Sequence, residues 1–525
     1  MNSVSEQVVV IGAGMGGLAA AIRLAVAGQQ VTLVEAAASP GGKMRTVSSD
    51  AGPVDAGPTV LTLRGVFDDL FTLAGERLED HLTLLPQPLL ARHWWPDGSR
   101  LDLFSDPQMS AAAIEAFAGP TEAKGFLRFH AATAALYNAF EGPVMRAARP
   151  DIAAIVKAAM ASPRLWPALM PGVSLDRFVA RYFGDPRLQQ LFGRYATYVG
   201  GRPGHSPAVL ALIWQAEARG VWAVDGGMHG LALALAGLAA RKGVTLHLGT
   251  SVARILRQSG RVSGVQLADG RSLACGHVVF NGDPAALTAG LLGDGVQMAL
   301  PRAATMPRSL SAQVWSFAAK LGGPVARELM HHNVFFSADP RLEFGPIGQG
   351  QLPTEPTVYL CAEDRAKKTF PAGKERIEII LNAPALTHQG TQDPEEATHC
   401  RTKTLQILRR IGLTLEPEPD LSALTTPHHL AQMFPGSMGA IYGRSPEGML
   451  ASFQRPTART ALPGLYLAGG GCHPGAGVPM AALSGQHAAE AMISDLTSAS
   501  KSAPTDTRGG MSMVSRMMGR GPFRS

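Results

Sequence analysis

The stretch VVVIGAGMGG, residues 8–17, decides the fold of this chain. Residues 7–11 form an apolar run rich in valine, which predicts a buried strand, and the glycines that follow predict a tight turn. The alanine-rich residues 18–27 predict a helix, and residues 30–35 predict a second strand. A strand, a glycine turn, a helix and a strand in this order begin a Rossmann-like unit, so we expect an α/β fold.

The glycine turn has the spacing of a dinucleotide-binding site. Gly12 permits the tight turn, Gly14 lets the backbone approach a pyrophosphate, and Gly17 permits close packing of helix on strand. The helix N-terminus offers unpaired N–H groups and a positive dipole to the phosphates. Glu35 follows Gly17 by 18 residues and can accept hydrogen bonds from the ribose hydroxyls. This pattern fits NAD and FAD equally.

Further glycine-rich segments favour FAD. SPGGKMRT (residues 39–46) and DAGPT (residues 55–59) follow Glu35 closely. Near the other end, residues 462–468 predict a strand, GGGCHPGAGVP (residues 469–479) a turn, and the following residues to 496 a helix. A helix N-terminus there would stabilise the negative charge of a reduced flavin. An NAD domain has no use for this second strand, turn and helix, so we predict FAD as the cofactor.

The same motifs resemble the bacterial carotenoid desaturases of the phytoene desaturase type. The resemblance runs from about residue 6 to 496 and is most specific in HPGAGVP, residues 473–479. Within that family, residues 469–473 and 479–481 are most similar to the hydroxyneurosporene (methoxyneurosporene) dehydrogenases, which are 1-hydroxycarotenoid 3,4-desaturases. One departure is Gly470-Gly471, where many flavin amine oxidases carry an acid for the ribityl hydroxyls.

The resemblance implies an FAD-dependent desaturation of a polyene, with hydride transfer to flavin N5 and no side-chain base. The cofactor-binding residues that we predict are Gly12, Gly14, Met15, Gly16, Gly17, Glu35, Gly42, Lys43, Gly57, Pro58, Thr59, Val252, Gly470, Gly471, Gly477, Val478, Pro479 and Met480. No metal site is predicted, because the four cysteines are scattered and His331-His332 and His428-His429 lack ligand spacing.

The predicted architecture is a Rossmann-like FAD-binding domain with a mixed α+β substrate domain. The FAD domain is assembled from residues 1–65, 215–290 and 455–496, with residues 252–274 as an antiparallel meander. The substrate and membrane-contact domain takes residues 66–214, which we expect to be mostly helical, and 291–454. Residues 497–525 are rich in Ser, Lys, Arg, Gly and Met and predict a disordered tail.

Composition agrees with an apolar substrate. Apolar residues make up 46% of the chain and charged residues 17%, while the net charge of +6 gives no reason to expect nucleic acid. A carotenoid is insoluble, so we expect a cytoplasmic protein held peripherally on the inner membrane through an apolar patch in residues 110–220. The oligomeric state stays open.

Other functions remain open at this point. The near alternatives are phytoene desaturase and another carotenoid oxidase or isomerase. The more remote alternatives are a flavin amine or protoporphyrinogen oxidase and a non-enzymatic binder of prenyl lipids.

Overall fold

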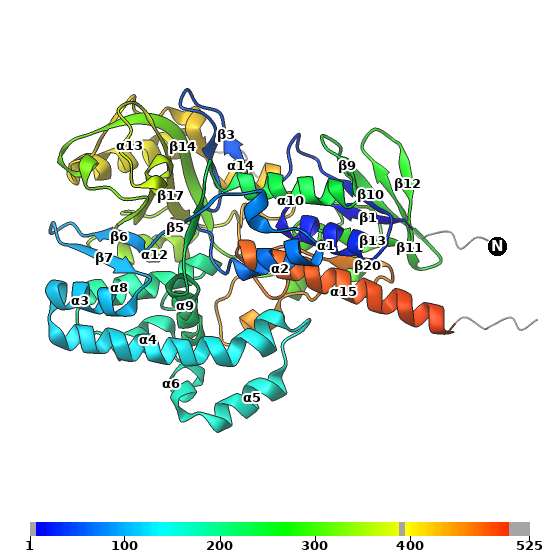
Figure 1. Ribbon diagram of the computed structural model, residues 1–525, viewed down its shortest axis with the longest axis horizontal. Coiled ribbons are helices and arrows are strands. Elements are labelled where there is room, and N and C mark those ends of the chain that lie inside the picture. The colour runs from blue at the N-terminus through cyan, green and yellow to red at the C-terminus, as the bar shows by residue number, and fades with distance from the viewer. Residues whose placement is uncertain (1–6, 388–393, 503–525) are drawn as a thin grey trace, which may run out of the picture.

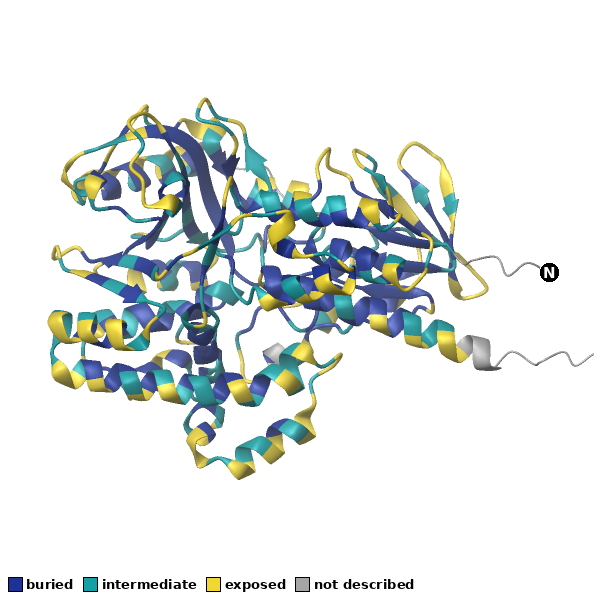
Figure 2. Ribbon diagram, viewed as in Figure 1, coloured by how far each residue is buried: buried dark blue, intermediate teal, exposed yellow. Residues whose placement is uncertain are grey.

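The computed structural model describes residues 7–387 and 394–502. Figure 1 shows a small parallel sheet with its helices on the right and a larger sheet with a helical layer on the left. Figure 2 shows that the strands of both sheets are largely buried, whereas exposed residues gather on the outer helix faces and the loops.

The small sheet has the strand order β20-β13-β1-β2-β9, and every neighbouring pair in it is parallel. Its strands are β1 (Val8–Ile11), β2 (Val31–Val34), β9 (Thr245–His247), β13 (His277–Phe280) and β20 (Leu465–Leu467). These strands come from three separate parts of the chain that all lie in the segments predicted for the FAD domain. The predicted Rossmann-like α/β fold class is confirmed.

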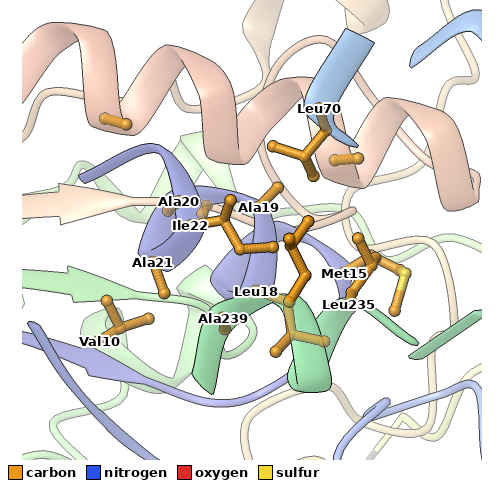
Figure 3. Close-up of a cluster of buried hydrophobic side chains, with 14 of the residues drawn as sticks. Val10, Met15, Leu18, Ala19, Ala20, Ala21, Ile22, Leu70, Leu235 and Ala239 are labelled. Carbon is orange, nitrogen blue, oxygen red and sulfur yellow. The ribbon is translucent and has the colours of Figure 1, made fainter. Parts of the chain in front are cut away.

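Helices beside this sheet pack closely on one another. They are α1 (Met15–Val26), α2 (Gly65–Leu73), α10 (His229–Arg241) and α15 (Val478–Ser502). Figure 3 shows Ala21 of α1 near Val10 of the sheet and Leu18 near Leu235 of α10, with Ala19 and Ile22 toward Leu70 of α2. Helix α1 begins earlier than residue 18, where we expected it, so Met15, Gly16 and Gly17 form its first turn.

The second sheet has eight strands, in the order β18-β14-β17-β16-β15-β6-β7 with β19 paired to β14. The strands are β6 (Leu89–Trp94), β7 (Arg100–Phe104), β14 (Ser311–Gly322), β15 (His332–Phe335), β16 (Val358–Ala362), β17 (Glu375–Ala383), β18 (Thr414–Glu416) and β19 (Leu424–Thr425). All pairs except β15 with β6 are antiparallel.

Strands within residues 84–104 contradict the mostly helical expectation for that region. Strand β5 (Leu84–Pro86) pairs with β8 (Trp222–Val224), and β6 pairs in parallel with β15, more than two hundred residues away. These two partners are remote in sequence, but β6 and β7 form a local hairpin around Asp97-Gly98, a turn signal that the sequence analysis did not use.

The helical layer on the second sheet agrees with the expectation. It contains α3 (Pro107–Ala118), α4 (Pro120–Phe140), α5 (Ile152–Ala161), α6 (Trp166–Leu169), α7 (Leu175–Val179), α8 (Pro186–Gly193) and α9 (Ile213–Ala218). A core of aromatic side chains joins these helices to the sheet. The other helices are α11 (Pro284–Thr288), α12 (Arg341–Gly348), α13 (Pro394–Arg410) and α14 (Pro427–Met433).

Two remaining predictions concern short strands and the tail. The meander is confirmed as β10 (Val252–Gln258), β11 (Arg261–Leu267) and β12 (Ser272–Ala274), and β3 (Thr46–Val47) pairs with β4 (Val54–Asp55). The tail was predicted to begin at residue 497, but α15 continues to Ser502, because no glycine or proline interrupts residues 497–502. Residues 503–525 lie outside the described residues.

Candidate functional site

The N-terminal and C-terminal glycine turns, more than 450 residues apart in sequence, are in contact. A Cβ atom on Gly16 would lie 2.5 Å from the backbone nitrogen of Gly469 and 2.9 Å from the carbonyl oxygen of Ala481. Only a residue without a side chain fits at this approach. The two turns therefore form one surface, in which the N-termini of α1 and α15 lie side by side.

The loops after β2 complete that surface. The Gly41 N–H donates to the Ala13 carbonyl (2.9 Å), and a Cβ on Gly42 would lie 3.2 Å from the Cα of Gly14. A Cβ on Gly57 would lie 2.0 Å from the Lys43 carbonyl oxygen, so the loop that carries Pro58 and Thr59 packs on the first loop. The predicted residues from Gly12 to Thr59 are thus brought together.

Glu35 is held at the edge of this surface by backbone donors. Its carboxylate oxygens accept from the N–H groups of Ala13 (2.6 Å) and Ala37 (2.8 Å). A carboxylate has about four acceptor positions, so two remain for ribose hydroxyls. Val252 begins β10 two residues after Thr250, whose N–H donates to the Glu35 carbonyl (2.8 Å).

The first turn of α15 contains Val478, Pro479 and Met480. The N–H groups at a helix start have no partner within the helix, so this turn and that of α1 can both receive negative charge. Gly477 is exposed at the edge of the site, whereas Gly470 and Gly471 are half-buried beside the N-terminal turn.

Three residues outside the predicted site list support the turns, and one of them, Arg455, belongs to the segment 434–456 that shares in the family resemblance. Asn281 follows β13 and donates from Nδ2 to the Gly12 carbonyl (3.2 Å). Ser484 accepts from the Gly469 N–H (2.6 Å), and Arg455 donates to the carbonyls of Tyr442 (2.8 Å) and Gly470 (3.0 Å). A polar residue directly after a buried strand was a usable signal for Asn281, but Ser484 had none.

Lys43 faces the interior of the site. Its Nζ donates to the Ile441 carbonyl (2.7 Å) and lies 5.4 Å from the ring centroid of Phe434. Burial lowers the pKa of Lys43 to about 8, so the side chain is readily neutralised. This places an adaptable donor where the predicted cofactor loops meet residues 434–442.

A chain of hydrogen bonds leads from these loops into the second sheet. The Tyr359 hydroxyl lies 2.7 Å from Thr59 Oγ1 and 2.7 Å from His332 Nδ1. Tyr359 stands on β16 and His332 on β15, so two neighbouring strands position the pair. Burial, reinforced by His331, holds the pKa of His332 well below its usual range, so this ring is neutral at neutral pH.

His331, His332 and Cys361 bring three potential metal ligands within 4.8 Å of one another. The sequence pattern had excluded the histidines on spacing, but β16 brings Cys361 opposite His332. The Cys361 sulfur lies about equally far from both nitrogens of the His331 ring (3.9 and 4.0 Å), so it faces the ring plane rather than a lone pair. The absence of a metal stays a prediction.

Three buried carboxyl groups gather behind the Thr59 loop, although the sequence predicted no acid–base cluster. The Asp55 N–H donates to Glu363 (2.8 Å), which lies 3.3 Å from Arg376, and Glu378 is fully buried nearby on β17. Burial and then the neighbouring Asp55 raise the pKa of Glu363 to about 8. Asp55, Glu363 and Arg376 line a cavity of about 130 Å³, enough for a few water molecules.

Together these features fit FAD. The α1 N-terminus can hold a pyrophosphate, Glu35 a ribose, and the surface between Lys43, Thr59 and Gly470 a flavin ring. The close approach of Gly16 to Gly469 brings together the two turns that would hold different parts of such a cofactor. A flavin there can accept a hydride, whereas the surrounding residues can orient a substrate and exclude water.

Comparison with known proteins agrees with this geometry. Residues 15–493 match the family described as flavin containing amine oxidoreductase. The hydroxyneurosporene desaturase of Cereibacter sphaeroides is 62% identical, over 95% of this chain and 100% of that protein. The hydroxyneurosporene desaturase of Rhodobacter capsulatus is 56% identical, over 94% of this chain and 99% of that protein.

A solved structure shows the same fold. The fatty acid isomerase from P. acnes that produces CLA superposes with a TM-score of 0.58 at 14% identity, over 94% of this chain and 99% of that protein. At this low identity the similarity supports the fold and no further property.

Proposed function

Because this chain belongs to the flavin-containing amine oxidoreductases, we propose that it is an FAD-dependent carotenoid desaturase that forms the 3,4 double bond of a 1-hydroxycarotenoid. The family confirms the predicted FAD cofactor and the oxidoreductase class. The proposed substrate rests on the sequence identity of 62% and 56% to two hydroxyneurosporene desaturases over nearly the whole chain.

The residues of the two glycine turns would hold the cofactor. We assign the pyrophosphate to the N-terminus of α1, the adenosine ribose to Glu35, and the flavin ring to the surface bounded by Lys43, Thr59 and Gly470. FAD, when bound, supplies the hydride acceptor that an unactivated C–H bond requires.

The residues of the protein contribute by positioning the substrate and by excluding water from the reacting bond. The helical layer presents a continuous aromatic core that includes Phe126, Phe129, Phe192 and Trp214. These rings are fully buried, so they make a rigid, dry layer behind the surface that would face a polyene. Holding the C–H bond at about 3–3.5 Å from its acceptor is the main source of rate enhancement available here.

Substrate comparison tests this proposal. The purified FAD-loaded protein is incubated in lipid vesicles with 1-hydroxyneurosporene, neurosporene or phytoene. We expect turnover of 1-hydroxyneurosporene with a red-shifted product, because one more double bond extends the conjugated chain. Turnover of phytoene alone would instead favour a phytoene desaturase, and turnover of none would contradict the proposal.

The proposal includes peripheral contact with a membrane through α5. No helix among the described residues is long and apolar enough to span a bilayer. However, Ile152, Val156 and Met160, at a spacing of four on one face of α5, are 52%, 51% and 77% exposed. Trp166 and Met170 in and after α6 extend this apolar surface, and Figure 1 shows α5 and α6 at the bottom, away from both sheets.

The chain that leads into α5 contacts the C-terminal glycine turn and α15. His473 lies at hydrogen-bond distance from the Ala147 carbonyl (2.8 Å), and His487 of α15 from the Arg146 carbonyl (3.2 Å). Residues 146 and 147 directly precede α5 in the chain. A polyene drawn from the bilayer at α5 would therefore enter close to the site.

Vesicle flotation of Met160→Glu tests the membrane contact. We expect this variant to float with vesicles at least several-fold less than the unaltered protein, because burying a charge opposes insertion. Met298→Glu is the matched control, since Met298 is also 77% exposed but lies outside α5 and α6. Equal loss of flotation in both variants would contradict a role for α5.

A further inference from the structure

Arg194 carries a charge into the apolar helical layer. It opens a short 3₁₀ helix, Arg194–Val199, which follows α8 and ends at Gly200. Aromatic rings surround this helix: Phe192 and Trp214 lie with their centroids 6.4 and 5.9 Å from that of Tyr195. Burying a guanidinium among such rings costs free energy unless its N–H groups find hydrogen-bond partners.

A pair of tyrosines and a buried acid hold the guanidinium in place. The hydroxyls of Tyr195 (2.6 Å) and Tyr198 both donate to the Glu217 carboxylate. Residues three apart in a 3₁₀ helix share a face, which is why both rings reach the same acid. Arg194 Nη2 donates to the Tyr198 hydroxyl (3.3 Å), so its charge reaches Glu217 only through that hydroxyl.

Arg194 keeps donors to spare. Among the described residues its Nη2 donates to Tyr198 and its Nη1 has no hydrogen-bond partner, whereas its Nε is fully enclosed by protein. Arginine presents five N–H donors in a fixed plane, so a group that uses one of them here can still bind an oxygen atom.

The Arg194 charge is close enough to His332 and Tyr442, beside the cofactor loops, to influence the pKa of both side chains. Arg194, Tyr198, Tyr359, Tyr442 and Lys43 are surrounded by protein, yet each keeps partly accessible surface. Side chains combine these two properties when they border an enclosed space. Lys43 and Tyr359, through its contact with Thr59, belong to the proposed flavin surface.

Packing places the end of this 3₁₀ helix next to the C-terminal turn. A Cβ on Gly200 would lie 2.5 Å from Cδ2 of Tyr442. The Tyr442 carbonyl accepts from Arg455, which also donates to Gly470. The end of this 3₁₀ helix therefore lies beside the C-terminal turn, and the Arg194 charge is close enough to Tyr442 to oppose the rise that burial causes in the pKa of that hydroxyl.

The proposed reaction requires a polar group at this position. In a 1-hydroxycarotenoid, four bonds of about 1.5 Å separate the hydroxyl oxygen from C4, so the two atoms are at most about 5 Å apart. Whatever binds the hydroxyl must consequently lie beside the flavin. In an otherwise hydrocarbon substrate, this oxygen is the one atom that a charged donor can recognise.

We propose that Arg194, positioned by Tyr198 and Glu217, donates a hydrogen bond to the terminal hydroxyl of the polyene and so selects the hydroxylated end for desaturation. This subsite rests on the proposed function, of which it names the specificity-determining residue. Discrimination arises because a polyene without the hydroxyl leaves the guanidinium donors unpaired in a dry site.

Binding of two matched polyenes tests the subsite. The dissociation constants of 1-hydroxyneurosporene and neurosporene are measured on the FAD-loaded full chain, for the unaltered protein and for Arg194→Leu. We expect the preference for the hydroxylated polyene to fall roughly 10- to 100-fold in the variant, with neurosporene affinity nearly unchanged. Equal weakening of both polyenes, or no change in their ratio, would overturn the proposal.

Two further variants keep the test clear. Arg194→Lys retains a charged donor and should restore part of the preference, whereas Arg219→Leu should leave it intact. Arg219 is the matched control, because it also lies over a tyrosine ring, 4.0 Å from the Tyr137 centroid, but at the surface. If Arg194→Leu fails to fold, Tyr198→Phe replaces it, with a smaller fall expected, and an unchanged ratio in that variant overturns the proposal.

The same proteins separate this inference from the proposed function. Absence of turnover of any carotenoid by the unaltered protein contradicts the desaturase, whatever the binding ratio. Turnover of 1-hydroxyneurosporene combined with an unchanged ratio in Arg194→Leu contradicts the subsite alone.

Discussion

The cofactor side and the substrate side of this molecule are built on different principles. On the cofactor side, Gly16 and Gly469 bring two backbones into contact, and hydrogen bonds to main-chain groups position Glu35. On the side proposed for the substrate, titratable side chains such as Arg194 and Glu363 are held by other side chains. The first side tolerates no added atom, whereas the second depends on charge in a dry environment.

Replacement of Gly16 by alanine is expected to have the largest effect. The new Cβ would lie 2.5 Å from the Gly469 nitrogen, and neither backbone can yield without separating α1 from α15. We expect flavin content, measured by absorbance near 450 nm, to fall more than about tenfold and unfolding free energy to drop by at least about 2 kcal/mol. Gly65→Ala is the control, because a Cβ there meets no atom within 4 Å. A Gly16→Ala protein with normal flavin content would break the idea that backbone contact builds this side.

Replacement of Glu35 by glutamine should weaken FAD binding without disturbing the fold. The amide keeps one acceptor but turns its NH₂ group toward the N–H of Ala13 or Ala37. Loss of a charged acceptor of this kind costs about 1.5–3 kcal/mol, so the FAD dissociation constant should rise about 10- to 100-fold in a titration of the apoprotein. Glu490→Gln, at an exposed position of α15, should bind FAD as before.

The substrate side should make stability depend on pH. Burial raises the pKa of Glu363 to about 8 from 4.5, so between these values the folded protein holds a proton that the unfolded chain has lost. Stability should therefore fall as the pH rises from about 5 to 8, by about 3.5 kcal/mol, and Glu363→Gln should flatten this slope. Urea unfolding at several pH values measures it. The exposed Glu115→Gln replacement should leave the slope unchanged, and an equal slope in Glu363→Gln would show that the buried acid is not its source.

Removal of metal ions by a chelator should leave the activity unchanged. His331, His332 and Cys361 are close together, but burial keeps both rings neutral and raises the pKa of the Cys361 thiol well above its usual value. Elemental analysis of the purified protein and activity after dialysis against EDTA measure this. A stoichiometric metal that Cys361→Ser removes would show that the substrate side holds more than side-chain charge.

The turns could be predicted from the sequence because their constraints are local. A position that permits no side chain is recognised in the sequence because only glycine can stand there. The glycine turns also follow strands that are apolar runs, as at Gly12, Gly14, Gly41 and Gly469. The order of strand, turn and helix at both ends of the chain indicated one bound FAD. Asn281 was missed, although its place directly after β13 could have revealed it.

The substrate side could not be predicted in the same way. Strand β6 pairs with β15 more than two hundred residues away, and this pairing had no local signal, although the β6–β7 hairpin had one in Asp97-Gly98. Arg194 resembles any surface arginine until Glu217, from another segment, fixes the neighbouring Tyr198 beside it.

The sequence by itself determined the nucleotide-binding unit and its cofactor, since these depend on residue type and short spacing, and the apolar substrate followed from the family resemblance. Only the tertiary structure decided which charges are buried beside the flavin surface and which apolar face stays exposed. The physical reason is that burial and pairing arise between segments that are distant in sequence, and a side chain's chemistry in a dry site depends on those neighbours.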